Sequence, residues 1–237
     1  MNAAATTTPP VRASGSLCAD LLALLNLLVR WPTGSIAIEG RTLSGIGTSS
    51  NALRCNGTAL ALLPVALLEL LAARPAWGIT FSAAVLDGRR PIALAAAFTT
   101  FDLVPTFANG PEGWRWYVDE ARVAAADEAL AAFPIRPAVV IDGFAQLVAV
   151  WPLTAPIVAD DRARRLLAGL AARLGGDVLE DPLTARLPLP GGICRNVGAL
   201  HVPVVRFVEL EPERTVALTE LDTALAGDGA RVKGAAR

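Results

Sequence analysis

Apolar residues recur every three or four positions in several stretches of the chain, which is the spacing that places them on one face of an α-helix. In the first such stretch, leucines keep this spacing from Leu17 onward and Pro32 follows directly after Trp31. The residue before a proline disfavours the helical conformation, so this helix is expected to end before Trp31. The predicted helices are Ser16–Trp31, Ala59–Ala73, Val118–Phe133, Asp161–Leu174 and a short one that starts near Thr219.

Polar residues at the ends of two of these stretches support the assignment. Asp160 precedes Asp161–Leu174 as an N-cap, and Gly175-Gly176 follows it as a C-terminal stop. Thr219 and Asp222 have nearly the spacing of a capping box, so they are expected to start the last helix.

Two Asp-Gly pairs, Asp87-Gly88 and Asp142-Gly143, each lie between runs rich in apolar, β-branched or aromatic residues. Asp-Gly is typical of tight turns that join antiparallel strands, so each pair predicts a β-hairpin. Asp142 is therefore most simply a turn residue. The predicted strands are Trp77–Leu86 and Pro91–Leu103 around the first turn, Val139–Ile141 and Gln146–Trp151 around the second, and Pro203–Leu210.

This order of elements predicts an α/β (α+β) fold, with a mostly antiparallel sheet covered by helices. No short internal repeat interrupts it, so residues 16–226 are expected to form a single domain. Residues 1–15 are expected to be a disordered leader, because Thr and Pro stand where a secretory signal needs a basic and then an apolar region. Residues 227–237 are expected to be a flexible tail.

Two further segments are expected to be loops. Thr42–Gly57 is dense in Ser, Gly, Thr and Asn, and it could either cradle a phosphate or connect two elements at the surface. The surface connection is favoured, because the strand, Gly-rich turn and Lys of a phosphate-binding loop are not there. Trp114, Trp116 and Tyr117 lie in a second loop, where they either stack on bases or, as the favoured alternative, seal the sheet.

The composition narrows the class of protein. The chain is 53% hydrophobic and 18% charged, with a mean hydropathy of +0.47, but charged or polar residues and Pro interrupt its apolar runs before the ~20 residues that a membrane span needs. No membrane is therefore expected as a partner. Cys18, Cys55 and Cys194 are far apart and the chain has one His, which disfavours a disulfide framework or a zinc site and indicates a cytoplasmic protein.

The charge balance constrains any nucleic-acid interaction. The formal net charge is −1, and Lys233 is the only lysine. Such a chain lacks the overall basic surface of a nonspecific DNA-binding protein, so a few arginines would have to supply the phosphate contacts.

Three blocks between about Leu60 and Leu225 share their order with one known family. The first has a helix, then Trp77–Phe81, then a strand that ends in Thr100-Phe101-Asp102; the second is Pro137–Leu153; the third has an acid, Arg186 and Leu189-Pro190-Gly191 before a Pro-led strand. In this order the blocks resemble the RepB-like primase-polymerases of plasmids and phages, a branch of the archaeo-eukaryotic primase superfamily. The resemblance implies RRM-like, mostly antiparallel sheets flanked by helices around a cleft.

The resemblance also assigns roles, and it shows where the chain departs from the family. The family has two acids separated by one residue, and here Thr100 stands for the first, so only Asp102 is kept. Asp177 or Asp181 takes the place of the further acid. The family's inward-facing His is absent, and Gln146 is the nearest polar substitute. Gly192 and Cys194 stand where the family usually has Thr and Asn after Leu-Pro-Gly, although Arg195 and Asn196 lie close by.

Nucleotidyl transfer by such proteins needs divalent cations that bridge the attacking hydroxyl and the triphosphate, and carboxylates hold these ions. Oxygen ligands suit Mg²⁺ or Mn²⁺. The resemblance therefore implies a reduced metal site that contains Asp102 and Asp177. The residues implied in the site are Asp102, Asp177 and Asp181 for catalysis, and Gln146, Arg186, Arg195, Asn196 and Arg54 for nucleotide or DNA contacts.

Each of these residues also has a simpler interpretation. An Asp at a strand end, such as Asp102, often caps a turn. Arg186 and Arg195, on either side of a Pro-Gly turn, fit solvated loop residues equally well. His201 lies just before a strand without a Ser or Cys nucleophile pattern, so a structural role is expected.

The function implied by the resemblance is that of a replication-associated protein from a mobile element. It would bind single-stranded or primed DNA and nucleoside triphosphates, together with a replicative helicase, and its nucleotidyltransferase activity would be reduced. The alternative is a non-catalytic DNA-binding or partner-docking module that keeps the fold. A small α/β protein unrelated to replication is the third interpretation.

Overall fold

The computed structural model describes residues 17–28, 35–42, 51–55, 77–110, 113–191 and 205–227. Its helices are α1 (Leu17–Leu28), α3 (Glu120–Ala132), α4 (Asp161–Leu174), α5 (Leu218–Ala226) and the short 3-10 helix η1 (Pro182–Thr184). Its strands are β1 (Ser35–Thr42), β2 (Asn51–Cys55), β3 (Trp77–Asp87), β4 (Arg90–Asp102), β5 (Thr106–Gly110), β6 (Gly113–Tyr117), β7 (Val139–Asp142), β8 (Gln146–Val158), β9 (Leu187–Pro188) and β10 (Arg206–Leu210).

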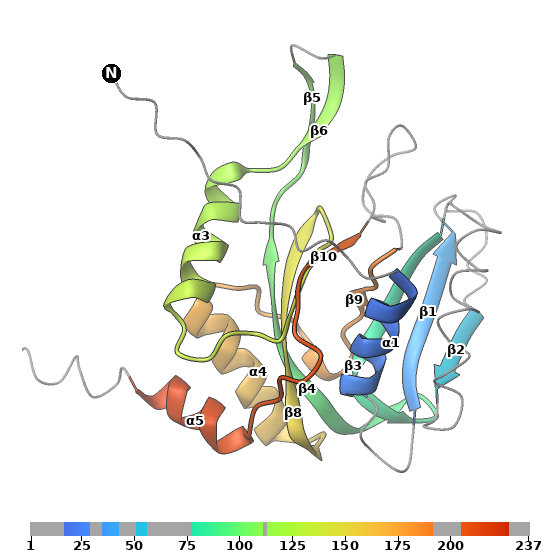
Figure 1. Ribbon diagram of the computed structural model, residues 1–237, viewed down its shortest axis with the longest axis vertical. Coiled ribbons are helices and arrows are strands. Elements are labelled where there is room, and N and C mark those ends of the chain that lie inside the picture. The colour runs from blue at the N-terminus through green and yellow to red at the C-terminus, as the bar shows by residue number, and fades with distance from the viewer. Residues whose placement is uncertain are drawn as a thin grey trace, which may run out of the picture.

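One curled sheet holds most of these strands, in the order β10-β7-β8-β4-β3-β1-β2, and β9 pairs with β3 as well. All these strand pairs are antiparallel. Figure 1 shows α1 over β1 and β3, whereas α3, α4 and α5 gather on the side of β4 and β8. The predicted fold class is therefore confirmed: a mostly antiparallel sheet flanked by helices.

Both predicted hairpins are confirmed, although the second differs in its details. β3 and β4 meet at a turn in which Gly88 has φ +61°, a conformation that suits glycine. β7 and β8 are joined by three residues rather than by a two-residue turn, and Phe144 among them has φ 65°.

β8 is longer than predicted, because it continues past Trp151 to Val158. The predicted strand ended at Trp151, directly before Pro152, and a proline has no N–H for the ladder. Pro152 instead lies opposite Ala96 next to a register shift between Leu94 and Ala96. Its carbonyl accepts a hydrogen bond from the Val216 N–H at 2.9 Å. Irregular positions such as this one tolerate proline within a sheet.

The helices on the β4 side begin close to where the sequence places them. Asp160 caps α4 by accepting hydrogen bonds from the N–H groups of Arg162 and Ala163, and Gly175 ends the helix in the left-handed conformation. The predicted Thr219–Asp222 cap is wrong. α5 begins one residue earlier, and the Glu220 carboxylate accepts from the Ala217 N–H at 2.8 Å, so Glu220 rather than Asp222 provides the cap.

Two segments predicted as loops contain strands. β2 lies within Thr42–Gly57 and pairs with β1 in a regular register, so the prediction of one loop was wrong there. The segment that carries Trp114 and Trp116 forms the separate hairpin β5–β6, which projects from the rest of the molecule in Figure 1. Ser, Gly and Asn around β2 obscured that strand, whereas β6 carries Trp114 and Trp116 in alternation, a strand signal that the loop prediction did not use.

Other predictions lie outside the described residues: the helix Ala59–Ala73, the 1–15 leader, the tail beyond residue 227, and the Pro203 end of the last strand. Among the helices that the structure describes, none has both the length and the apolar character needed to cross a bilayer.

The core extends across the whole sheet. α1 contributes buried leucines to it, and β4 and β8 contribute long buried runs. Trp151 is 1% exposed; its ring meets that of Phe133 edge to face at 5.7 Å, and its Nε1 donates to the Ile135 carbonyl at 2.9 Å. These contacts fix the end of α3 against β8, because a buried indole needs both apolar contacts and a partner for its N–H.

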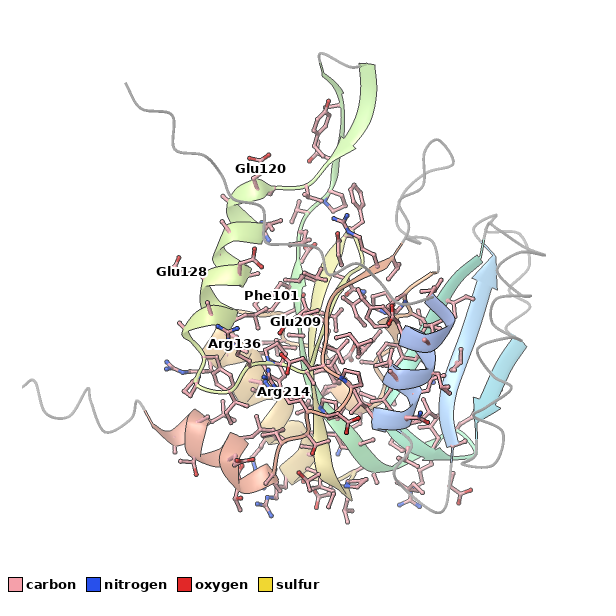
Figure 2. All side chains as sticks on the ribbon, in the orientation of Figure 1. Phe101, Glu120, Glu128, Arg136, Glu209 and Arg214 are labelled. Atoms are coloured by element: carbon pink, nitrogen blue, oxygen red, sulfur yellow. The ribbon has the colours of Figure 1, made fainter. Side chains whose placement is uncertain are left out.

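Charged residues gather where β10 forms an edge of the sheet. Glu209, Arg136 and Arg214 lie close together there in Figure 2, and Arg214 pairs with Glu211 at 2.7 Å. Burial raises the pKa of Glu209 above its ordinary value of 4.5, and the hydrogen bond and charge of Glu211 raise it further, whereas Arg214 and Arg136 lower it. The raising contributions dominate, so the fold favours the protonated form.

We therefore expect Glu209→Gln to raise the melting temperature at pH 7. A carboxyl group with a raised pKa in the folded state contributes stability below its unfolded pKa and loses it as the pH rises through the folded value. The gain should disappear at about pH 4. Melting temperatures of Glu209→Gln and of the exposed control Glu213→Gln, measured between pH 4 and pH 7, test this prediction. A lower melting temperature for Glu209→Gln at pH 7 would show that the arginines outweigh the burial.

Candidate functional site

The site begins where the long β3–β4 hairpin opens. The ladder between β3 and β4 runs from the Asp87–Arg90 pair to the Ala84–Leu94 pair and stops. Beyond that point β4 continues beside β8 as far as Asp102, whereas β3 pairs with β9 at Thr80 and Phe81. The sheet thus divides into two halves. They are joined near the β3–β4 turn and separate toward the end of β4 that carries Asp102.

A cavity of about 270 Å³ lies between these halves. Thr100 of β4 and Gln146 of β8 line it from one half, and Leu187 of β9 lines it from the other. The connection between α4 and β9 supplies the remaining wall. Its lining residues are Leu179, Glu180, Asp181, Ala185 and Arg186.

The β7–β8 turn closes this region against β9. A Cβ added to Gly143 would lie 3.0 Å from both Pro188 Cγ and the Gln146 carbonyl oxygen, so the turn is packed closely against β9 and glycine suits this position. Asp142 fixes the same turn: one carboxylate oxygen accepts from the Phe144 N–H at 2.8 Å, and the other accepts from Arg206 Nε and Nη2, both at 2.9 Å. Asp142 therefore has the turn role that the sequence favoured.

Asp177 is anchored to β4 rather than left in solvent. Its N–H donates to the Thr100 carbonyl at 2.7 Å, and its Oδ2 accepts from Thr100 Oγ1 at 3.1 Å. Thr100 is 3% exposed. The two hydrogen bonds join the end of α4 to β4 at Thr100, the residue that the resemblance aligns with the family's first acid.

Asp102 lies opposite Gln146 in the β4–β8 ladder, so its side chain is on the same side of the sheet as those of Gln146 and Thr100. Phe101 alternates to the other face, toward α3 (Figure 2). The Asp102 carboxylate accepts from the Val104 N–H at 3.0 Å and is not part of the cavity lining. Val104 has φ 44°, a strained value for a β-branched residue, and this hydrogen bond stabilises it. In this structure Asp102 therefore caps a turn.

Asp181 and Arg186 flank η1 and both line the cavity. Asp181 accepts from Thr184 Oγ1 at 3.1 Å and lies 3.6 Å from Arg164 Nε. Arg186 Nη1 donates to the Thr184 carbonyl at 2.9 Å. One cation and two carboxylates, those of Glu180 and Asp181, thus border the cavity.

The structure brings most of the predicted site residues that it describes to one place. Gln146, Asp181 and Arg186 line the cavity, and Asp177 is bonded to a residue that does, whereas Asp102 stands one strand repeat from Thr100, about 7 Å along β4. Arg195 and Asn196 lie outside the described residues, as does the side chain of Arg54, whose backbone is in β2.

Sequence reasoning missed Glu180 and did not assign Thr100 to the lining. Glu180 stands in an acid-rich connection, Asp177–Asp181, from which only the aspartates were chosen because the family pattern has one acid there. Thr100 was read as a lost carboxylate, although a hydroxyl that bonds to Asp177 remains a polar group in the site.

The resemblance implies a reduced metal site that contains Asp102 and Asp177. Nowhere in the part of the chain that the structure describes do three His, Cys, Asp or Glu side chains come together in a geometry that could hold a metal ion. The Asp102 carboxylate caps a turn and that of Asp177 is bonded to Thr100.

No protein-family model and no curated protein matches the chain at the sequence level. Its structure is similar to the AEP domain of the cyanophage S-2L primase-polymerase, with a TM-score of 0.58 and 13% identity over 87% of this chain and 97% of that one. For primase RepB′ the TM-score is 0.56 at 12% identity, over 92% and 64%. The catalytic domain of primase RepB′ in complex with initiator DNA gives 0.56 at 12% identity, over 93% and 97%. The chain therefore has the primase-polymerase fold that its three blocks predicted.

Gly176 provides a test of the Asp177 anchor. A Cβ at this position would overlap Thr99 Oγ1 and lie 2.7 Å from the Thr100 carbonyl oxygen, so Gly176→Ala must push the connection away from β4. We expect a loss of about 1–3 kcal/mol in the free energy of unfolding, measured by urea denaturation.

Gly169→Ala is the matched control within α4, because its Cβ would meet only Leu225 Cδ1 at 3.4 Å. We expect it to be neutral or to stabilise by roughly 0.5–1 kcal/mol, since glycine disfavours a helix interior. Equal effects of the two substitutions would show that Gly176 is not held tightly against β4.

Proposed function

We propose that this chain is a replication-associated protein of the primase-polymerase type, and that the cavity between the two sheet halves binds a nucleotide or the end of a DNA strand. The observation that carries the proposal is the position of this cavity. It lies where the halves of a primase-polymerase fold separate, and it brings Gln146 and Arg186 together from segments 40 residues apart in the sequence.

The lining residues suit such a ligand. Arg186 offers a guanidinium group, whose planar set of donors matches phosphate oxygens. The Gln146 amide can both donate and accept a hydrogen bond, as a base edge or a sugar hydroxyl requires. The carboxylates of Glu180 and Asp181 can accept from sugar hydroxyls or amino groups. A ligand with both a phosphate and hydrogen-bonding donors fits this mixed lining better than a bare polyphosphate does.

The name of one structural neighbour supports a DNA ligand, because the RepB′ catalytic domain was solved in complex with initiator DNA. The identity is 12%, so the likeness supports the fold and leaves the ligand to experiment. The helicase partner and the mobile-element origin, which the resemblance implies, remain predictions, as does the cytoplasmic location, which the cysteines indicate.

The second candidate function is a non-catalytic DNA-binding or docking module with the same fold. The positions of the carboxylates favour it, since Asp102 caps a turn and Thr100 replaces an acid. Both candidates bind ligands in the same cavity, and they differ in Mn²⁺-dependent incorporation of labelled nucleotides on primed or unprimed templates. We expect incorporation to be weak or absent.

Arg186→Ala tests the binding site directly. If Arg186 contacts a phosphate, the variant should bind single-stranded DNA more weakly, and the slope of log affinity against log salt should become less negative by about 0.7, the value for one single-strand phosphate contact. Fluorescence anisotropy with an oligonucleotide at several salt concentrations measures both quantities.

Arg165→Ala is the matched control, because it removes the same charge from an exposed position of α4 that does not line the cavity. Its affinity and slope should stay close to those of the unmodified protein. Equal effects of the two variants would mean that Arg186 acts only through net charge.

Thr100→Asp tests whether the cavity wall retains the ability to bind a metal ion. The new carboxylate would lie beside Asp177 at a position that is 3% exposed, so we expect a loss of about 2–4 kcal/mol from burial and like-charge repulsion. A cation that both carboxylates share would reverse this loss, so Mn²⁺ should raise the melting temperature of Thr100→Asp.

Thr100→Asn is the control of the same size without the charge, and its melting temperature should not respond to Mn²⁺. If Thr100→Asp is destabilised and Mn²⁺ has no effect, the alignment of this strand with the family's acid pair is wrong and the non-catalytic module is the better interpretation.

A further inference from the structure

Two carboxylates line the cavity between the sheet halves, and they differ in their contacts within the chain. Asp181 accepts a hydrogen bond from Thr184 Oγ1 and lies 3.6 Å from Arg164 Nε. Glu180 is exposed, and no residue that the structure describes bonds to its side chain or forms an ion pair with it. Glu180 is therefore the carboxylate of the lining that is available to a ligand.

A negatively charged group at this position restricts which ligands can fill the cavity. A ligand displaces water from the carboxylate, and the loss of those hydrogen bonds is costly unless the ligand supplies donors of its own. A phosphate does not supply them, because its oxygens are acceptors that carry negative charge. We therefore expect the phosphate of a nucleotide to lie at Arg186, and a part of the nucleotide that carries donors to lie at Glu180.

The rest of the lining indicates that this part is the base. Leu187 is 1% exposed, Leu179 and Ala185 are half-buried, and all three line the cavity. Apolar side chains pack well against the flat face of a base, whereas the hydroxyl groups of a sugar need polar neighbours. A cavity of about 150 Å³ accommodates benzene, so one of about 270 Å³ has room for the two fused rings of a purine.

Among the bases of DNA, guanine matches a single carboxylate best. Its ring N1–H and its amino group at C2 are adjacent donors that point in the same direction, so they can bond to both oxygens of one carboxylate, as the parallel donors of arginine do. Adenine and cytosine offer an amino group without a neighbouring ring N–H, and thymine offers one ring N–H. The carbonyl oxygen of guanine is an acceptor, and the Gln146 amide, which lines the cavity from β8, can donate to such a group.

We propose that the cavity selects guanine nucleotides, and that Glu180 determines this selection by accepting hydrogen bonds from the N1–H and the amino group of the base. This inference rests on the proposed function, because it names the base that the nucleotide site prefers. Glu180 is thus a specificity-determining residue, whereas Arg186 binds the phosphate of any nucleotide.

The test compares GMP with IMP, two nucleotides that differ only in the amino group at C2, by NMR titration of the ¹⁵N-labelled full chain. The unmodified protein should bind GMP about tenfold more tightly than IMP, which is the effect of one hydrogen bond to a charged group. In Glu180→Gln the ratio should fall to about threefold or less, the effect of a neutral hydrogen bond. A purely structural role for Glu180 would change both affinities by the same factor and leave their ratio as it was.

Glu128→Gln is the matched control. It makes the same substitution at an exposed position of α3, outside the lining and away from the sheet in Figure 2. Its ratio of GMP to IMP affinity should equal that of the unmodified protein. A second pair of nucleotides, GMP and dGMP, differs only in the 2′-hydroxyl, and Glu180→Gln should leave the ratio of their affinities unchanged.

The selection of guanine is overturned if GMP and IMP bind the unmodified protein equally, or if Glu180→Gln leaves their ratio unchanged. It is also overturned if Glu180→Gln alters the ratio of GMP to dGMP instead, which would place the sugar at this carboxylate. In each of these cases a loss of affinity in Arg186→Ala would still support the nucleotide site. If no nucleotide binds the unmodified protein, the proposed function and the selection both fail.

Discussion

The separation of β3 from β4 is the constraint on which the rest of the structure depends. If the two strands stayed paired along their full length, β9 could not pair with β3, and Thr100 and Leu187 could not face one cavity. The two halves are held by different groups. The core around Trp151 holds the β8 side, and the close approach of Gly143 to Pro188 joins the halves again at the mouth.

The aspartates in and around the site bond to other groups of the chain. Asp102 stabilises a strained turn at Val104, Asp177 ties the end of α4 to β4, and Asp181 lies near Arg164. Each of these acids makes a contact within the chain, so the site differs from one in which carboxylates converge on a cation. Arg186 and Gln146 provide the groups suited to a phosphate and to a base or sugar, which is why binding is better supported than polymerisation.

The sequence predicted the parts of the fold that depend on local signals. Apolar periodicity, the Asp160 cap and the Asp-Gly pairs identified α4 and both hairpins, because each signal is complete within a few residues. β2 was missed because Ser, Gly and Asn surround it and the strand forms by pairing with β1. The β5–β6 hairpin was missed although Trp114 and Trp116 alternate along β6, because these aromatic residues were assigned to a loop. The length of β8 was missed for a related reason, because the register shift that tolerates Pro152 is a property of β4 as well.

From the sequence it was easier to predict which residues gather around the cavity than which partners their side chains bond to. The order of the three blocks grouped Gln146, Asp181 and Arg186, and in the structure all three line one cavity. Spacing alone could not show that Asp102 would bond to the Val104 N–H or that Glu180 would join the lining. A side chain's partner depends on the turn that follows it, and Val104 with its positive φ has no sequence signature.

The most direct test of the binding site is an NMR titration of ¹⁵N-labelled protein with a deoxynucleoside triphosphate and, separately, with a short single-stranded oligonucleotide. The amide signals of Thr100, Gln146 and Leu187 should shift together, because they line one cavity from both sheet halves. Shifts confined to β10 or α5, with these three amides unchanged at saturating ligand, would contradict the assignment of the cavity as the binding site.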